Sequence, residues 1–132
     1  MLRLLSLLIF KINSWNVEDK VTYPKKCIII AAPHTSNWDF LIGRCYGYIQ
    51  KIHPKYLIKS EVFYPIIGTL LKLNGGIPVY RNKSHNVVDQ IVEKFNKSNI
   101  LRLAIAPEGT RSRVLKWKTI IYPLSYKWNT KT

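Results

Sequence analysis

A histidine, His34, and an aspartate, Asp39, are separated by four residues shortly after an apolar run at positions 27–31. The run predicts a buried strand, and Ser36 and Asn37 are typical helix-capping residues. The pair therefore falls on a strand-to-helix turn, where open α/β sheets carry their chemistry. A neutral imidazole can remove a proton from a hydroxyl, and a carboxylate can fix its tautomer. No Ser or Cys at a nucleophile elbow accompanies the pair, so we interpret His34 as a base that activates a substrate hydroxyl.

Two further turns combine glycines with an arginine. One is residues 75–81, which ends at Arg81, and the other is residues 106–112, which contains Arg111. Glycines permit close approach of the backbone to a ligand, and an arginine can hold a phosphate through two parallel hydrogen bonds. Taken alone, each arginine also fits ordinary surface charge, and His34 also fits a solvated loop histidine. Together, a base and two arginines at strand ends indicate group transfer on a phosphorylated substrate.

Alternating apolar segments predict the elements that place these turns. Strands that alternate with helices indicate one α/β domain, with a central, mostly parallel or mixed sheet flanked by helices. The expected strands are residues 27–32, 56–58, 77–80 and 101–106, with a further short strand within residues 16–26, and the expected helices are residues 38–51, 64–73 and 86–95.

The composition describes a strongly basic chain. Its 132 residues suffice for one domain, and 47% of them are hydrophobic, which is enough for a core. Lys and Arg number 21 against 7 Asp and Glu, and the net charge of +14 implies anionic partners such as nucleic acid, acidic lipid surfaces or phosphorylated substrates. The two cysteines, Cys27 and Cys45, are too few for a disulfide framework and are expected to be core thiols in a reducing compartment.

The first residues form a dense apolar segment that ends at Lys11. It is shorter than the roughly 20 apolar residues that span a bilayer, and it lacks a small-residue cleavage site before Trp15. An interfacial helix fits, with Trp15 at headgroup depth and Lys11 facing phosphates. An ordinary core helix is the alternative. We therefore divide the chain into a membrane-interfacial helix at residues 1–15 and a main domain at residues 16–132.

The three turns resemble sequence blocks of the glycerolipid acyltransferases, of the lysophosphatidic acid acyltransferase type. Residues 34–39 (HTSNWD) resemble that family's HxxxxD block, residues 76–81 (GIPVYR) its Gly-Ile block that ends in Arg, and residues 107–112 (PEGTRS) its Pro-Glu-Gly-Thr-Arg-Ser block. They occur in the family's order. The resemblance implies the family's α/β fold and O-acyl transfer to a glycerolipid in phospholipid biosynthesis.

The resemblance also implies a role for each block. His34 would deprotonate the acceptor hydroxyl, which would attack the thioester of acyl-CoA or an acyl-carrier protein, and Asp39 would orient His34. The favoured acceptor is the lysophospholipid 1-acylglycerol-3-phosphate, at the cytoplasmic face of an anionic membrane, with the enzyme peripheral or monotopic. No metal and no bound cofactor are expected, because the acyl thioester is a co-substrate. Arg111 would bind the phosphate directly, and Glu108 would hold Arg111 or another cation. The residues expected to bind substrate are Gly76, Arg81, Glu108, Gly109, Thr110 and Arg111.

The C-terminal segment departs from the family's pattern. Ile120 and Ile121 follow residues 116–119, where a glycine and an aromatic residue normally stand, and the family's apolar fourth block is absent. The resemblance thus suggests a domain that is incomplete at its C-terminus, by truncation or a frame shift near residue 120. Missing strands would leave a sheet edge exposed. An inactive, membrane-associated fragment is therefore one possible function of the chain.

Two more functions fit the sequence. The same chemistry could act on another lipid acceptor, because the three blocks report the reaction better than the acceptor. A basic nucleic-acid-binding module would also fit the charge. Against it, the sequence has no recognition-helix, zinc or aromatic RNA-binding motif, so no nucleic-acid partner is expected.

Overall fold

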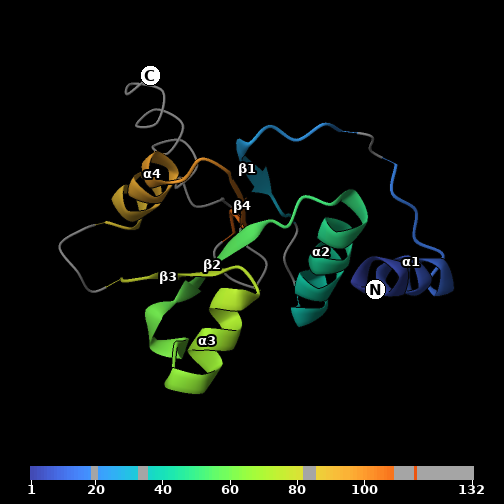
Figure 1. Cartoon of the computed structure of the whole chain (residues 1–132), viewed down its shortest axis with the longest axis horizontal. Helices are drawn as coiled ribbons and strands as arrows, with labels where there is room; N and C mark the ends of the chain where they lie inside the picture. Colours follow the sequence, from blue (N-terminus) through green and yellow to red (C-terminus); the bar gives the residue numbers. More distant parts are fainter. Residues whose placement is uncertain (19–20, 33–35, 82–85, 109–114, 116–132) are drawn as a thin grey trace.

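A four-stranded parallel sheet organises the chain in the computed structural model (Figure 1). The structure describes residues 1–18, 21–32, 36–81, 86–108 and 115. The strand order is β1-β4-β2-β3, so the last described strand lies between the first and the second. This confirms the predicted α/β class and makes the sheet wholly parallel within the described residues. The strands are β1 (Lys26–Ile30), β2 (Lys55–Lys59), β3 (Gly76–Val79) and β4 (Leu101–Ile105).

Helices cover both faces of this sheet. The connections from β1 to β2 and from β2 to β3 run in one direction along the sheet, whereas the connection from β3 to β4 runs back. Right-handed crossovers therefore place α2 and α3 on one face and α4 on the other, as Figure 1 shows. The helices are α1 (Leu2–Ile12), α2 (Asn37–Gln50), α3 (Pro65–Leu73) and α4 (Val87–Lys97), with a short 3-10 turn, η1 (Ser60–Val62), before α3.

The main hydrophobic core lies between α4 and the sheet. The helix starts at Asn86, whose Oδ1 accepts a hydrogen bond from the Val88 N–H at 2.6 Å. Its apolar residues recur at helical spacing, and those of β4 alternate along the strand, so both elements present one apolar side. These two apolar sides pack against each other. The buried core residues are Val88, Ile91, Val92, Phe95, Leu101, Leu103 and Ile105.

Two half-buried arginines stabilise the α2 side. The Arg102 guanidinium donates to the carbonyl oxygens of Pro24 at 3.0 Å and Ile52 at 3.3 Å. From α2, Arg44 donates to the Asn74 Oδ1 at 2.7 Å. Because Asn74 precedes β3 and Pro24 precedes β1, these bonds fasten the amino ends of the strands.

Two local expectations need correction. Residues 15–18 and 21–25 form no strand, and Pro24 explains part of this because proline has no N–H to donate to a sheet. Residues 76–79 of the expected turn at 75–81 form β3 instead, and the turn before that strand is made by Asn74 and Gly75, which has a φ of +96°.

The N-terminal helix α1 packs on α2 by one side only. Ser6 and Phe10 are buried, and the Phe10 ring meets Trp15 edge-on at 5.6 Å. In contrast, Leu4 is 71% exposed and Ile12 is 72% exposed, so most of the apolar surface of α1 faces outward. Among the helices of the described residues, none is long and apolar enough to cross a bilayer.

Candidate active site

The parallel sheet brings the three polar turns to one edge. Because all strands run the same way, the turns after β1, β3 and β4 leave from the carboxyl edge of the sheet. Ile30 of β1 pairs with Ile105 of β4, and the next residue, Ala31, donates its N–H to the Ile105 carbonyl at 2.9 Å. The first and third turns therefore start side by side. The turn after β3 starts two strands from β4, about 10 Å away.

The first turn ends in a capping box at the start of α2. The Ser36 hydroxyl accepts a hydrogen bond from the Trp38 N–H at 3.2 Å, and the Asp39 Oδ2 accepts one from the Ser36 N–H at 2.7 Å. Asp39 is half-buried and lies in the first helical turn, where the helix dipole favours a negative charge. Its carboxylate is thus held at the N-terminal end of α2. His34 lies outside the described residues, so its contact with Asp39 stays a prediction.

The two predicted residues of the second turn lie at opposite ends of β3. Gly76 is buried at the amino end, where an added Cβ would lie 2.9 Å from the Leu71 carbonyl oxygen and 3.0 Å from the Ile58 Cδ1. Close packing against α3 therefore accounts for this glycine. Arg81 follows the carboxyl end of β3 and is exposed. The structure brings Arg81 to the carboxyl edge and leaves Gly76 away from it.

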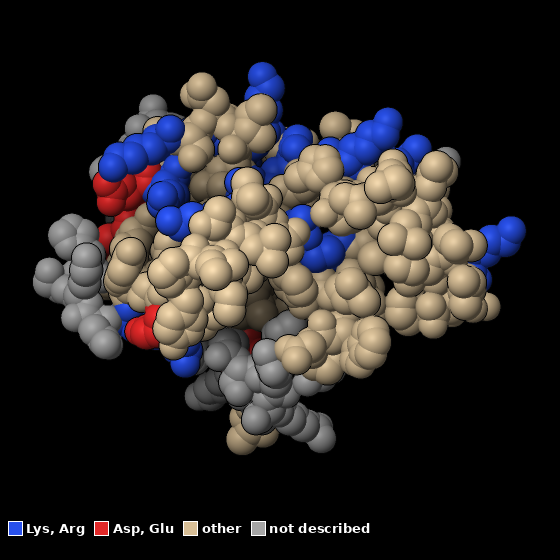
Figure 2. Space-filling model, turned by 60° about the horizontal axis from the view of Figure 1, so that its bottom comes forward, with Lys and Arg blue, Asp and Glu red and all other residues tan. Residues whose placement is uncertain are grey.

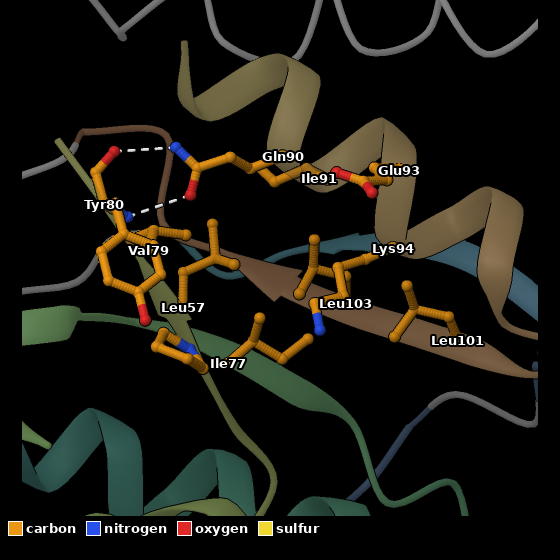
Figure 3. A pocket seen from close by; sticks show the side chains of 11 residues that line it. Leu57, Ile77, Val79, Tyr80, Gln90, Ile91, Glu93, Lys94, Leu101 and Leu103 are labelled. Carbon is orange, nitrogen blue, oxygen red and sulfur yellow. Dashed lines mark hydrogen bonds between the residues drawn. The ribbon is translucent and has the colours of Figure 1, made fainter. Parts of the chain in front are cut away.

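A glutamine of α4 fixes the backbone just before Arg81. The Tyr80 N–H donates to the Gln90 Oε1 at 3.0 Å, and the Gln90 Nε2 donates to the Tyr80 carbonyl at 2.7 Å (Figure 3). The side-chain amide thus pairs with Tyr80 much as a neighbouring strand would. Sequence reasoning missed Gln90. In the sequence it is one of several polar residues of the predicted helix, and its partners are backbone groups, which leave no sequence signature.

The third turn leaves β4 through a buried proline. Pro107 is among the most completely buried residues, and Glu108 after it is half-buried and engaged by other groups. Gly109, Thr110 and Arg111 lie outside the described residues, so the expected pairing of Glu108 with Arg111 stays a prediction. Asp39, Arg81 and Glu108 are the predicted site residues that the described structure places at the carboxyl edge.

An apolar groove of about 280 Å³ runs between α4 and the sheet (Figure 3). It extends from Tyr80, at the carboxyl edge, to Leu101, at the amino end of β4. Its floor is apolar, while Glu93 and Lys94 of α4 stand on its wall. Such a groove suits an extended hydrocarbon chain better than a charged ligand. The remaining lining residues are Leu57, Ile77, Pro78, Val79, Gln90, Ile91 and Leu103.

The cysteines do not supply a nucleophile to this edge. Both are free, with Cys45 buried and Cys27 half-buried near the amino end of β1. Burial raises the pKa of the Cys27 thiol, and the opposing charge of Arg102 only partly offsets this. A protonated thiol is a poor nucleophile. The described residues contain no cluster of three His, Cys, Asp or Glu side chains that could hold a metal ion.

The α/β fold, with three polar turns that start at the carboxyl edge of its sheet, fits a transferase of the α/β class. Residues 14–127 match the family model described as Acyltransferase. The match covers most of the chain, so the chain belongs to this family, and the protein is an enzyme that transfers acyl groups to lipids. No curated protein and no solved structure matches the chain significantly. The family that the sequence suggested is thereby confirmed, while the roles of the individual sequence blocks stay predictions.

Proposed function

We propose that this acyltransferase moves a fatty acyl group from acyl-CoA or an acyl-carrier protein to the free hydroxyl of a lysophospholipid. The favoured acceptor is 1-acylglycerol-3-phosphate, which assigns the enzyme to phospholipid biosynthesis. The observation that carries the proposal is the pairing of β1 with β4 in a chain of this family. That pairing starts the His34 turn and the Glu108 turn from adjacent strand ends.

The proposed reaction needs one base and no enzyme nucleophile. His34 takes the proton of the acceptor hydroxyl while the oxygen attacks the thioester carbonyl carbon. The tetrahedral intermediate then collapses, the carbon–sulfur bond breaks, and the imidazolium returns its proton to the leaving thiolate. Asp39, held in its capping box, orients His34 and stabilises the imidazolium. Atoms and charge balance without a metal or a redox cofactor.

The acceptor phosphate would be held by arginines of the other two turns. Arg81 is exposed at the carboxyl edge, and Gln90 fastens the backbone that precedes it. Arg111 is the second proposed ligand, with Glu108 holding a cation in place. Gly109 and Thr110 complete the proposed binding turn. The net charge of +14 supports an anionic acceptor and an anionic donor.

The proposed setting is the cytoplasmic face of an anionic membrane, with the enzyme peripheral or monotopic. Support comes from α1, where Leu4, Leu8 and Ile12 are exposed and Lys11 lies in the last turn. The apolar groove beneath α4 is our candidate for the acyl chain, because Tyr80, at the carboxyl edge, is one of its lining residues.

The test is acyl transfer from labelled acyl-CoA to lysophosphatidate in detergent micelles. We expect transfer by the parent chain and loss of at least about a hundredfold in His34→Ala. His53→Asn is the matched control, since His53 is exposed, lies before β2 at the opposite edge and has a φ of +43° that asparagine tolerates. Equal transfer by parent and His34→Ala would overturn the mechanism.

A second arm of the test addresses the acceptor. Lysophosphatidate is compared with monoacylglycerol, which lacks the phosphate, and with a lysophospholipid whose phosphate is a diester. A preference for the phosphomonoester is expected from the proposed arginine ligands. Equal or faster transfer to the other acceptors would replace lysophosphatidate while leaving the reaction class intact.

A further inference from the structure

Helix α3 exposes an apolar stripe to solvent. Ile66 is 86% exposed, Leu70 is 67% exposed and Leu73 is 82% exposed. Their spacing of four and then three residues puts them on one side of the helix. Ile67, beside them, is 51% exposed. This is the reverse of a helix that buries its apolar side against a sheet.

The orientation of α3 keeps this stripe outside. Gly68 is buried on the inner side, where an added Cβ would lie 3.0 Å from the backbone of Phe63. Pro65 starts the helix directly after that contact. Turning the helix to bury Ile66 or Leu70 would break this close approach. The stripe is therefore a surface of the folded chain.

The stripe belongs to a wider uncharged face. Crossover handedness puts α3 on the same side of the sheet as α2, and α1 packs on α2. Figure 2 looks toward this side and shows a broad expanse with few charged side chains, while lysines and arginines gather mainly along its upper margin. Trp38 of α2, at 70% exposure, adds a large aromatic side chain to the exposed apolar surface of these helices.

Lysines next to α3 match the chemistry of an anionic lipid surface. Lys72 is exposed in the last turn, with its Nζ 6.0 Å from the centre of the Phe63 ring, and Lys59 is exposed at the end of β2. A long lysine stem can lie along apolar surface while its ammonium reaches a phosphate. An uncharged soluble partner would leave this positive margin, in a chain of net charge +14, without a counterpart.

We infer that α3 is a second bilayer-contact element, which inserts Ile66, Leu70 and Leu73 among the lipids of an anionic membrane. This membrane contact is additional to the proposed role of α1. Only its consequence for catalysis, which is that lipid headgroups lie beside the reacting turns, rests on the proposed function. The chain enters α3 from the carboxyl end of β2 through η1, so the first turn of α3 lies at the edge that carries Asp39 and Arg81. Contact there sets the lipid headgroups beside the reacting turns.

The test measures sedimentation of the 132-residue chain with vesicles of phosphatidylcholine, with and without phosphatidylglycerol. We expect the parent to bind the phosphatidylglycerol vesicles more strongly. The double variant Ile66→Ser/Leu70→Ser should lose about tenfold or more in partition, because two exposed apolar side chains no longer leave water. Ile100→Ser is the matched control: Ile100 is 59% exposed before β4, and its change should alter partition less than about twofold.

Three results would overturn the inference. The double variant could bind as the parent does, or the parent could fail to bind vesicles, or binding could be indifferent to phosphatidylglycerol. Sedimentation velocity adds a further contrary outcome: a parent dimer that the double variant dissociates, without vesicle binding, would assign α3 to a second copy of the chain. Thermal unfolding checks that both variants fold as the parent does.

The outcome is separable from that of the proposed function. His34→Ala should bind vesicles as the parent does, because it removes a proposed base and no apolar side chain. The double variant should keep its transfer rate on acceptor dispersed in detergent, where no bilayer contact is needed. If no chain transfers acyl groups, vesicle binding that depends on Ile66 and Leu70 still supports the role of α3.

Discussion

The Ser36 N–H donates to the Asp39 Oδ2 at 2.7 Å, so the aspartate of the His-x4-Asp pair is also the N3 residue of the capping box that starts α2. The bond restrains the carboxylate in the first turn of α2, immediately after the turn that follows β1. The dipole of α2 favours the charged form there. The spacing of the pair thus agrees with two requirements, a stable helix start and a fixed carboxylate.

Asp39→Asn should separate these two roles. The asparagine carbonyl can still accept from the Ser36 N–H, so we expect the free energy of unfolding to change by less than about 1 kcal/mol. The negative charge is lost, and acyl transfer should fall about a hundredfold or more. Urea unfolding and the micelle assay measure the two effects. Ser36→Ala is the counterpart, with about 1 kcal/mol lost through the cap. Transfer that survives in Asp39→Asn would show that the carboxylate serves the helix alone.

Gln90→Ala should weaken acceptor binding through the backbone. It removes both hydrogen bonds to Tyr80. A typical hydrogen bond contributes about 0.5–1.5 kcal/mol to stability, and each of these contributes less because it is exposed to solvent. We expect about 1 kcal/mol of lost stability and a several-fold rise in KM for lysophosphatidate, with kcat nearly unchanged. Asn96→Ala, an exposed position on the same helix, is the control. A fall in kcat at constant KM would contradict the positioning of Arg81 by Gln90.

The α4–β4 core could be predicted from the sequence because both patterns are strong. The helical recurrence of Val88, Ile91 and Phe95 and the alternation of Leu101 and Leu103 each specify one buried side. Segment α3 is equally apolar, and nothing in its residue pattern indicates that Ile66 and Leu70 face outward. The orientation depends on the contact of Gly68 with Phe63, which is a tertiary feature.

The candidate site was only partly predictable. Three strand ends could be expected at one edge, but the adjacency of β1 and β4 depends on pairing between segments far apart in the chain. Gly76 was grouped with Arg81 because they share a sequence block, yet β3 separates them along its length. Gln90 was missed because its partners are backbone groups, which have no sequence signature.

Stability should fall in alkaline solution, in part because of Cys27. Burial raises the pKa of this thiol above its ordinary value of 9.0, so the folded state holds the proton more tightly than the unfolded state. The resulting stabilisation is complete below pH 9.0 and is lost as the pH rises through the folded pKa. Cys27→Ala should therefore show a shallower decline in the free energy of unfolding above that pH. Urea unfolding across the alkaline range measures it, and parallel declines in parent and variant would refute the contribution.

Arg81→Ala should separate phosphate recognition from chemistry. Arg81 is exposed at the carboxyl edge, so its loss should change stability by less than about 0.5 kcal/mol. A charge-assisted bond to phosphate is worth about 1.5–3 kcal/mol, and we expect KM for lysophosphatidate to rise by roughly tenfold or more. KM for monoacylglycerol should change by less than about twofold, because this acceptor has no phosphate for Arg81 to bind. Lys55→Ala removes an exposed cation at the amino end of β2 and should leave both values unchanged. Equal increases for the two acceptors would mean that Arg81 supports the fold of the turn, and the phosphate would then have to be held elsewhere.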